Sequence, residues 1–258
     1  MSAVLRKAAL RREISVAEHI PYTAHVSDTV VRTKQGDYVQ VFRLSGASFE
    51  SADDATLNTW HERLNVLWRN IASPQVALWS HVIRRREWAT GTLGEAGGFA
   101  GRLEAKYRAR LAKETLMVNE LYLALVYRPV AGVATSWVAR LLARTKPQET
   151  QLEIKDALDA CEKLGQILRA SLDRYEPERL GVYRRSGRDH SRLLEFLSFL
   201  VSGEAQPVPL PRAPLSEAIG TSRLLFGFEA IEYRLPTETR VGAMLGIKEY
   251  PTPSGSGS

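Results

Sequence analysis

Cysteine is almost absent from this 258-residue sequence, because Cys161 is the only one. A lone cysteine forms no disulfide within the chain and excludes a cysteine-rich metal site, which is typical of a protein from a reducing compartment. No apolar run approaches the roughly 20 residues that a membrane-spanning helix needs, so any membrane contact is expected to be peripheral. The basic, alanine-rich start lacks the apolar segment of a secretory signal.

Catalytic motifs are also missing. The sequence contains no G-x-x-x-x-G-K-[ST] phosphate-binding loop, and the glycine-rich stretch 91–101 lacks the Lys and the Ser or Thr of such a loop. We interpret that stretch as a connector. The five histidines are scattered without metal-ligand spacing, and His81 is interpreted as a structural residue of a strand. No Ser-His-Asp grouping stands out. We therefore expect a non-enzymatic chain with no catalytic, cofactor-binding or metal-binding residues.

Acidic residues are fewer than basic ones. The chain has 35 Lys and Arg against 29 Asp and Glu, a net charge of +6, and most of the cations are arginines. This balance fits nucleic acid, anionic lipid or an acidic protein face as a partner. Arginine also suits bidentate phosphate contacts. An Arg-rich nucleic-acid-binding module is therefore one functional hypothesis, and a merely solvated surface is the plainer alternative.

The first 50 residues and the helix that follows them have clear local signals. Two β-rich segments, 29–33 and 38–44, flank a Gly-containing turn and predict a hairpin. A helix capped by Ser51 comes next, with apolar residues at helical spacing, and it ends at Ser73-Pro74. An alternating strand is predicted over 75–86.

The rest of this first part continues the alternation of helix and strand. Apolar residues on one face predict a helix over 103–111. The nearly continuous apolar run 119–127 predicts a central strand covered on both faces. The order β-β-α-β-α-β indicates an α+β subdomain over residues 1–130, with mostly antiparallel sheet and helices packed on it.

A helical part is predicted over residues 131–205. Its longest helix covers about 149–175 and has an apolar stripe with alternating spacings of four and three. That spacing is typical of a seam for another helix, either in this chain or in another one. A second helix is predicted to start at Asp189 as its cap and to stop at Gly203.

The C-terminal part, residues 206–251, begins with a proline-rich link. Strands are predicted over 223–228, 230–235 and 240–250, the last as a buried strand that ends at a proline. The Ser- and Gly-rich tail 252–258 is typical of an engineered linker or a truncation.

Two basic segments are candidate contact sites. Arg84, Arg85 and Arg86 close the strand over 75–86, so alternate side chains point to opposite faces. They could contact phosphate or an acidic helix, or form a solvated strand end.

The other segment lies near residue 137. It combines apolar and cationic residues at helical spacing: Trp137, Arg140, Leu141 and Arg144. Such a helix could lie in a bilayer interface or pack on the sheet.

Five short motifs, each present once, follow one another along the chain in an order that points to a known family. They are Ile20-Pro21-Tyr22, Gly36-Asp37-Tyr38, His81-Val82-Ile83-Arg84-Arg85, Asn119-Glu120-Leu121-Tyr122-Leu123, and the stretch from Gly242 to Pro251. Together they resemble the N-terminal domain of the conjugation and type IV secretion ATPases, the group named after its CagE, TrbE and VirB members. The resemblance covers about residues 20–251.

The resemblance implies a bacterial cytoplasmic ATPase that is peripheral on the cytoplasmic face of the inner membrane and powers pilus assembly and the transfer of DNA or protein. It implies contacts of the N-terminal domain with other inner-membrane subunits, and self-association of the whole ATPase in a ring. A membrane surface and transferred DNA are further candidate partners. ATP and Mg are expected only in a RecA-like C-terminal motor domain that is missing from this chain. The leading hypothesis is a docking and assembly domain that is non-catalytic on its own.

Overall fold

The computed structural model describes residues 16–87, 98–129, 147–235 and 238–246. The fold is α+β with antiparallel sheets, as the sequence predicts. The chain forms two compact units: Ala24–Val182, and a second unit from Met1–Thr23 and Tyr183–Ser258. The three-part division predicted from the sequence stays a prediction.

The unit Ala24–Val182 is built on a six-stranded sheet. Its main path has the strand order β1-β2-β3-β5-β4. Strand β6 pairs with Phe42 and Arg43 of β3, whereas β2 pairs with the other end of β3, at Tyr38 and Val39. The strands are β1 (Tyr22–Ser27), β2 (Val30–Thr33), β3 (Tyr38–Leu44), β4 (Val76–Glu87), β5 (Leu116–Tyr127) and β6 (Glu178–Arg179). The β2–β3 pair is antiparallel, which confirms the predicted hairpin.

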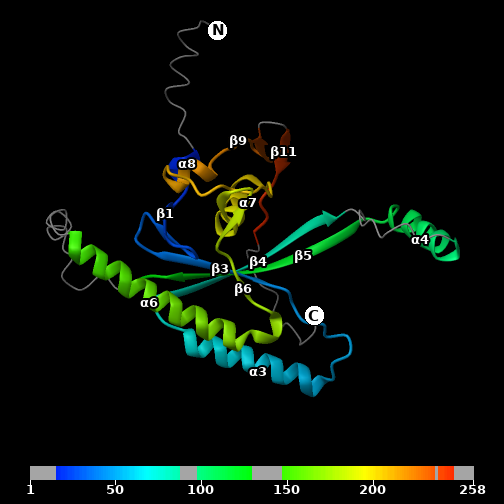
Figure 1. The fold of residues 1–258 in the computed structure, drawn as a ribbon, viewed down its shortest axis with the longest axis horizontal. Coiled ribbons are helices and arrows are strands. Elements are labelled where there is room, and N and C mark those ends of the chain that lie inside the picture. The colour runs from blue at the N-terminus through cyan, green and yellow to red at the C-terminus, as the bar shows by residue number, and fades with distance from the viewer. Residues whose placement is uncertain (1–15, 88–97, 130–146, 236–237, 247–258) are drawn as a thin grey trace, which may run out of the picture. The chain divides into compact units, whose positions relative to one another are not determined.

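Helices α3 (Asp54–Ile71) and α6 (Pro147–Ser171) lie side by side on one face of this sheet, as Figure 1 shows. Their apolar stripes meet the strands in one buried cluster: Phe42, Leu67, Ile71, Leu123, Leu125, Leu168 and Leu172. The seam of the long helix is therefore satisfied within this chain. The helix itself ends at Ser171, and a 3-10 turn, η2 (Asp173–Tyr175), completes the predicted span.

The cap of α3 differs from the expected one. Asp53, not Ser51, precedes the first turn, and its carboxylate accepts a hydrogen bond of 2.8 Å from the backbone N–H of Thr56. Both residue types cap helices well. The helix begins at Asp54, so only the Asp53 side chain can reach the free N–H groups of the first turn.

The second unit is smaller and mixed. Its elements are α2 (Val16–His19), the hairpin β7 (Val182–Arg185) and β8 (Arg188–Ser191), α7 (Arg192–Ser202), α8 (Leu215–Ile219) and the sheet β9 (Arg223–Phe226), β10 (Ile231–Arg234) and β11 (Thr239–Gly242). Ser186 and Gly187 both have positive φ at the β7–β8 turn, the conformation that a two-residue hairpin turn needs. The sequence indicated only a first short strand, at about Leu180–Arg184. The second strand and the turn were missed, although Ser-Gly between two short polar segments was their signal.

Helix α7 confirms its predicted stop but not its predicted cap. Gly203 ends it with φ of 70°, in the left-handed region that favours glycine. At the other end Ser191, rather than Asp189, accepts a hydrogen bond from the backbone N–H of Leu194. Asp189 belongs to β8, where its backbone pairs instead of starting a helix.

The last predicted strand, over 240–250, is confirmed only at its start, and that start is largely exposed instead of buried. Strand β11 ends at Gly242, residues 243–246 are not in a strand, and Val241 and Leu245 are 73% and 98% exposed. The reason is the partner strand: β10 begins at Ile231, which already pairs with Gly242. The ladder has no further residue to pair with, and residues 247–250 lie outside the described part.

Candidate interaction surface

The strands β4 and β5 form a ribbon of twelve antiparallel pairs, from Val76 with Tyr127 to Glu87 with Leu116. Helix α4 (Gly98–Leu111) is inserted in the connection at the Glu87 end, as Figure 1 shows. The opposite end of the ribbon contributes to the core under α3 and α6. We call the described residues 82–87 and 98–119 the arm.

Helix α4 presents an uncovered apolar stripe. Phe99, Leu103 and Tyr107 follow each other at intervals of four and are 73%, 57% and 61% exposed. None of the helix's residues is buried. A helix in a soluble protein normally buries its apolar face, so this stripe is available for a partner. The sequence predicted the helix only from residue 103 and therefore did not identify Phe99 as part of the stripe.

The three consecutive arginines divide between the two faces of the ribbon. Because side chains alternate along a strand, Arg84 and Arg86 share a face with Val82, and Met117 is paired directly opposite Arg86. Val82 and Met117 are 65% and 40% exposed. This face of the arm therefore combines cations with uncovered apolar groups.

Arg85 points to the other face and is already engaged. Its guanidinium donates to the carboxylate of Glu120, and Arg43 lies 3.8 Å from the same carboxylate. The hydroxyl of Tyr122 donates to Glu120 at 3.1 Å. Burial, and then the Glu120 charge, raise the pKa of Tyr122 to about 12. The phenol stays protonated near neutral pH, so this cluster is equipped to hold the strands together and not to transfer protons.

The arm has a large excess of basic over acidic residues. Its described residues include eight Lys and Arg against three Glu, a net charge of +5. One of those acids, Glu104, is paired with Arg108 across one helical turn at 2.6 Å. The complete chain has a net charge of +6. Within the described part of the chain, the arm is therefore a strongly cationic region.

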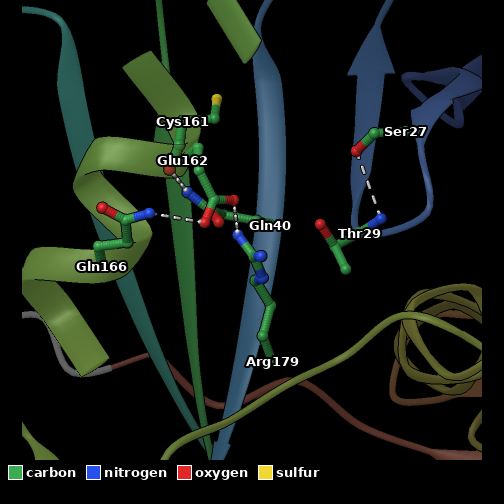
Figure 2. A network of polar contacts seen from close by, with 7 residues as sticks. All are labelled: Ser27, Thr29, Gln40, Cys161, Glu162, Gln166 and Arg179. Atoms are coloured by element: carbon green, nitrogen blue, oxygen red, sulfur yellow. Dashed lines mark hydrogen bonds and ion pairs between the residues drawn. The ribbon is translucent and has the colours of Figure 1, made fainter. Parts of the chain in front are cut away.

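A second polar cluster lies where α6 meets β3 and β6, shown in Figure 2. Gln40 is fully buried and donates from its amide nitrogen to the carbonyl of Cys161 at 2.8 Å. Arg179 donates to the Glu162 carboxylate at 2.6 Å, which lowers the pKa of Glu162. Burial raises the pKa of the Cys161 thiol to about 12 and so makes it a poor nucleophile. These contacts attach the helix to the sheet.

Next to this cluster is an open hollow of about 900 Å³. Arg169, Asp173, Glu176 and Arg179 are among the residues that line it. Its charges are mixed in sign and Arg179 is already paired with Glu162. The hollow therefore favours neither an anionic nor a cationic ligand.

The structure bears on some of the remaining candidate sites and leaves the segment near residue 137 untested. Burial lowers the pKa of His81, in keeping with a structural residue. In the sheet His81 is paired with Tyr122 of β5. Within the described residues, no three His, Cys, Asp or Glu side chains gather as metal ligands. No described helix is both long enough and apolar enough to cross a membrane. Trp137, Arg140, Leu141 and Arg144 lie outside the described residues.

Comparison with protein families gives two matches. The model described as "Type IV secretion system ATPase VirB4/TrbE, N-terminal domain" matches residues 29–134. The model described as "CagE, TrbE, VirB family, component of type IV transporter system" matches residues 178–258.

Several curated proteins are similar over nearly the whole chain. The type IV secretion system protein PtlC homolog of Bordetella bronchiseptica is 36% identical over 256 residues, which are 95% of this chain and 30% of that protein. The type IV secretion system protein virB4 of Bartonella quintana is 35% identical over 244 residues, 94% of this chain and 31% of that protein. The type IV secretion system protein virB4 of Brucella melitensis biotype 1 is 36% identical over 248 residues, which are 93% of this chain and 30% of that protein. The chain thus spans somewhat less than a third of these relatives.

Proposed function

Because the chain belongs to the VirB4/TrbE family of type IV secretion system ATPases and matches its N-terminal domain, we propose that it is the docking and assembly domain of such an ATPase. In this proposal it attaches the protein to the inner-membrane secretion complex and to neighbouring ATPase subunits, on the cytoplasmic face of the membrane. ATP and Mg bind elsewhere in the whole protein, and the domain alone is not catalytic.

The arm is the observation that carries this proposal. Outside its core the sheet extends a ribbon and a helix whose apolar side chains are uncovered and whose charge is strongly positive. Exposed apolar groups that are grouped together mark binding surfaces. The described polar clusters, in contrast, consist of ion pairs and buried hydrogen bonds that hold elements together. The geometry therefore supports binding better than chemistry.

Co-purification tests the docking role. We would produce the chain in cells together with the inner-membrane proteins of its own secretion system, and isolate the complex from detergent-solubilised membranes through a tag on one of those proteins. The chain should be recovered with the complex, and a double variant Phe99→Ser/Leu103→Ser should be recovered less. Val66→Ser on α3 is the matched control, since Val66 is also exposed, at 52%. Absence of the wild-type chain from the complex would refute the docking role.

The non-catalytic part of the proposal has its own test. The purified chain should release no phosphate from ATP with Mg²⁺ above a buffer control. Turnover that stays with the chain through successive purification steps would contradict it.

A nucleic-acid-binding module remains the second candidate function, and the concentration of eight cations on the arm favours it. Affinity for a fluorescent oligonucleotide should then fall steeply with salt, because phosphate contacts release counterions. If no binding occurs even at low salt, this candidate is eliminated.

A further inference from the structure

We propose that the arm binds an anionic lipid bilayer directly, with α4 lying in the headgroup region. The inference rests on the proposed docking function and specifies one partner of the docking surface. It is carried by the arrangement of apolar and cationic side chains on α4 and on the neighbouring ribbon face.

Two parallel stripes on α4 provide the first step. The apolar stripe is Phe99, Leu103 and Tyr107, and a basic stripe of Arg102, Lys106 and Arg110 has the same spacing of four. At 100° per residue the stripes are neighbours on the helix surface, offset by about 60°. A helix that lies in a membrane interface needs this combination, with apolar side chains among the acyl chains and cations at the phosphates.

The ribbon face provides the second step. Val82 and Met117 are exposed there beside Arg84 and Arg86. Long cationic side chains can extend toward headgroups while the apolar groups enter the bilayer. The same composition is thus repeated on two elements of the arm, with a net charge of +5 over its described residues.

The chemistry favours lipid over the other acidic partners. Nucleic acid is bound by stacking on aromatic rings and by phosphate contacts, and the aliphatic Val82, Leu103 and Met117 contribute to neither. A stable protein interface buries about 800 Å² on each partner, so a protein partner would have to contact more of the domain than the three apolar side chains of α4. An anionic bilayer requires no complementary shape and attracts each nearby Lys or Arg.

Vesicle co-sedimentation is the test. The probes are vesicles of phosphatidylcholine alone and vesicles that also contain phosphatidylglycerol. The wild-type chain should sediment with the phosphatidylglycerol vesicles and be released by high salt. Arg84→Glu/Arg86→Glu should weaken this binding by at least about tenfold, because each cation near an anionic surface contributes about 1 kcal/mol. Phe99→Ser/Leu103→Ser should weaken it by at least about tenfold as well, because two apolar side chains no longer enter the bilayer.

Matched controls separate the arm from general effects. Arg63→Glu/Arg69→Glu on α3 makes the same change in net charge away from the arm, and Leu152→Ser on α6 removes a side chain that is 63% exposed. Both controls should bind like the wild type. Thermal unfolding by circular dichroism should confirm that all variants fold.

Two results would overturn the inference. One is binding that is equal with and without phosphatidylglycerol, and the other is an equal loss in arm variants and controls. If vesicle binding is absent while co-purification with the secretion proteins still depends on Phe99 and Leu103, the partner of the arm is a protein. The docking proposal then stands and the lipid inference fails. A wild-type chain that binds only the oligonucleotide would contradict both.

Discussion

The two ends of the β4–β5 ribbon have the same backbone pairing and opposite surroundings. At the Tyr127 end, Leu123 and Leu125 are 6% and 0% exposed beneath α3 and α6. At the Glu87 end, Val82 is 65% exposed and helix α4 has no buried residue. One continuous ladder of twelve pairs joins them.

This contrast separates folding from binding within one supersecondary unit. Apolar side chains at the covered end are removed from water by the chain's own helices, and that burial stabilises the fold. The exposed apolar side chains of the arm gain less from folding, and in our proposal a partner covers them. Substitutions at the two ends should therefore have opposite consequences for stability and for binding.

The largest stability difference is expected between Leu125 and Val82. Leu125→Ala leaves a cavity under the helices and should lower the free energy of unfolding by about 2–5 kcal/mol. Val82→Ala changes an exposed side chain and should alter it by less than about 0.5 kcal/mol. Urea unfolding of both variants measures the difference. Equal losses would show that Val82 is packed in the free protein and would contradict the difference between the two ends of the ribbon.

A smaller effect is expected where α6 approaches the sheet most closely. A Cβ on Gly165 would lie 3.0 Å from Oε1 of Gln40 and 3.4 Å from the ring of Phe42, and both side chains are fully buried. Gly165→Val should therefore force the helix away from β3 and cost about 1–3 kcal/mol of stability. The exposed Gly98→Ala lacks such neighbours, although its φ of 72° adds its own strain.

Gly98→Ala is therefore not a suitable control for Gly165→Val, because backbone strain alone would change its stability. A better control is Ala170→Val, on the same helix and open to the hollow near its end. A melting temperature of Gly165→Val equal to that of Ala170→Val would contradict the close approach of helix and sheet.

The smallest effect concerns pH at the covered end. Arg179 lowers the pKa of Glu162 below its ordinary value of 4.5. A depressed pKa gives stability that is present above pH 4.5 and is lost as the pH falls through the folded-state pKa. Because the Glu162 side chain is 47% exposed, the contribution should stay under about 1 kcal/mol. Urea unfolding at pH 6 and pH 3 should show a smaller decrease for Glu162→Gln than for the wild type, and an identical decrease would rule the contribution out.

Much of the covered end could be predicted from the sequence because its signals are local. The hairpin over 29–44 follows from a turn between β-rich runs, and α3 from apolar residues at helical spacing up to Pro74. The family was also identified from motifs before the comparisons confirmed it.

The burial of the arm and the length of the C-terminal strand could not be predicted from local sequence signals. The run 119–127 is part of a central strand, as predicted, because β5 lies between β3 and β4. Only Leu123, Ala124 and Leu125 in this run are buried, since helix coverage is a tertiary property. The length of β11 depends on where β10 begins, which is a pairing across the sheet. The partner of Arg85 is likewise not a local one, because Glu120 is 35 positions away in the sequence.

Amide hydrogen exchange tests the central claim most directly, because it reports on both ends of the ribbon in one experiment. The chain would be measured alone and bound to membranes that contain the inner-membrane proteins of its secretion system. We expect added protection in residues 82–87 and 98–119 and no change in residues 121–127, which pair with both β3 and β4 in the free chain. Added protection elsewhere with none in the arm would contradict it.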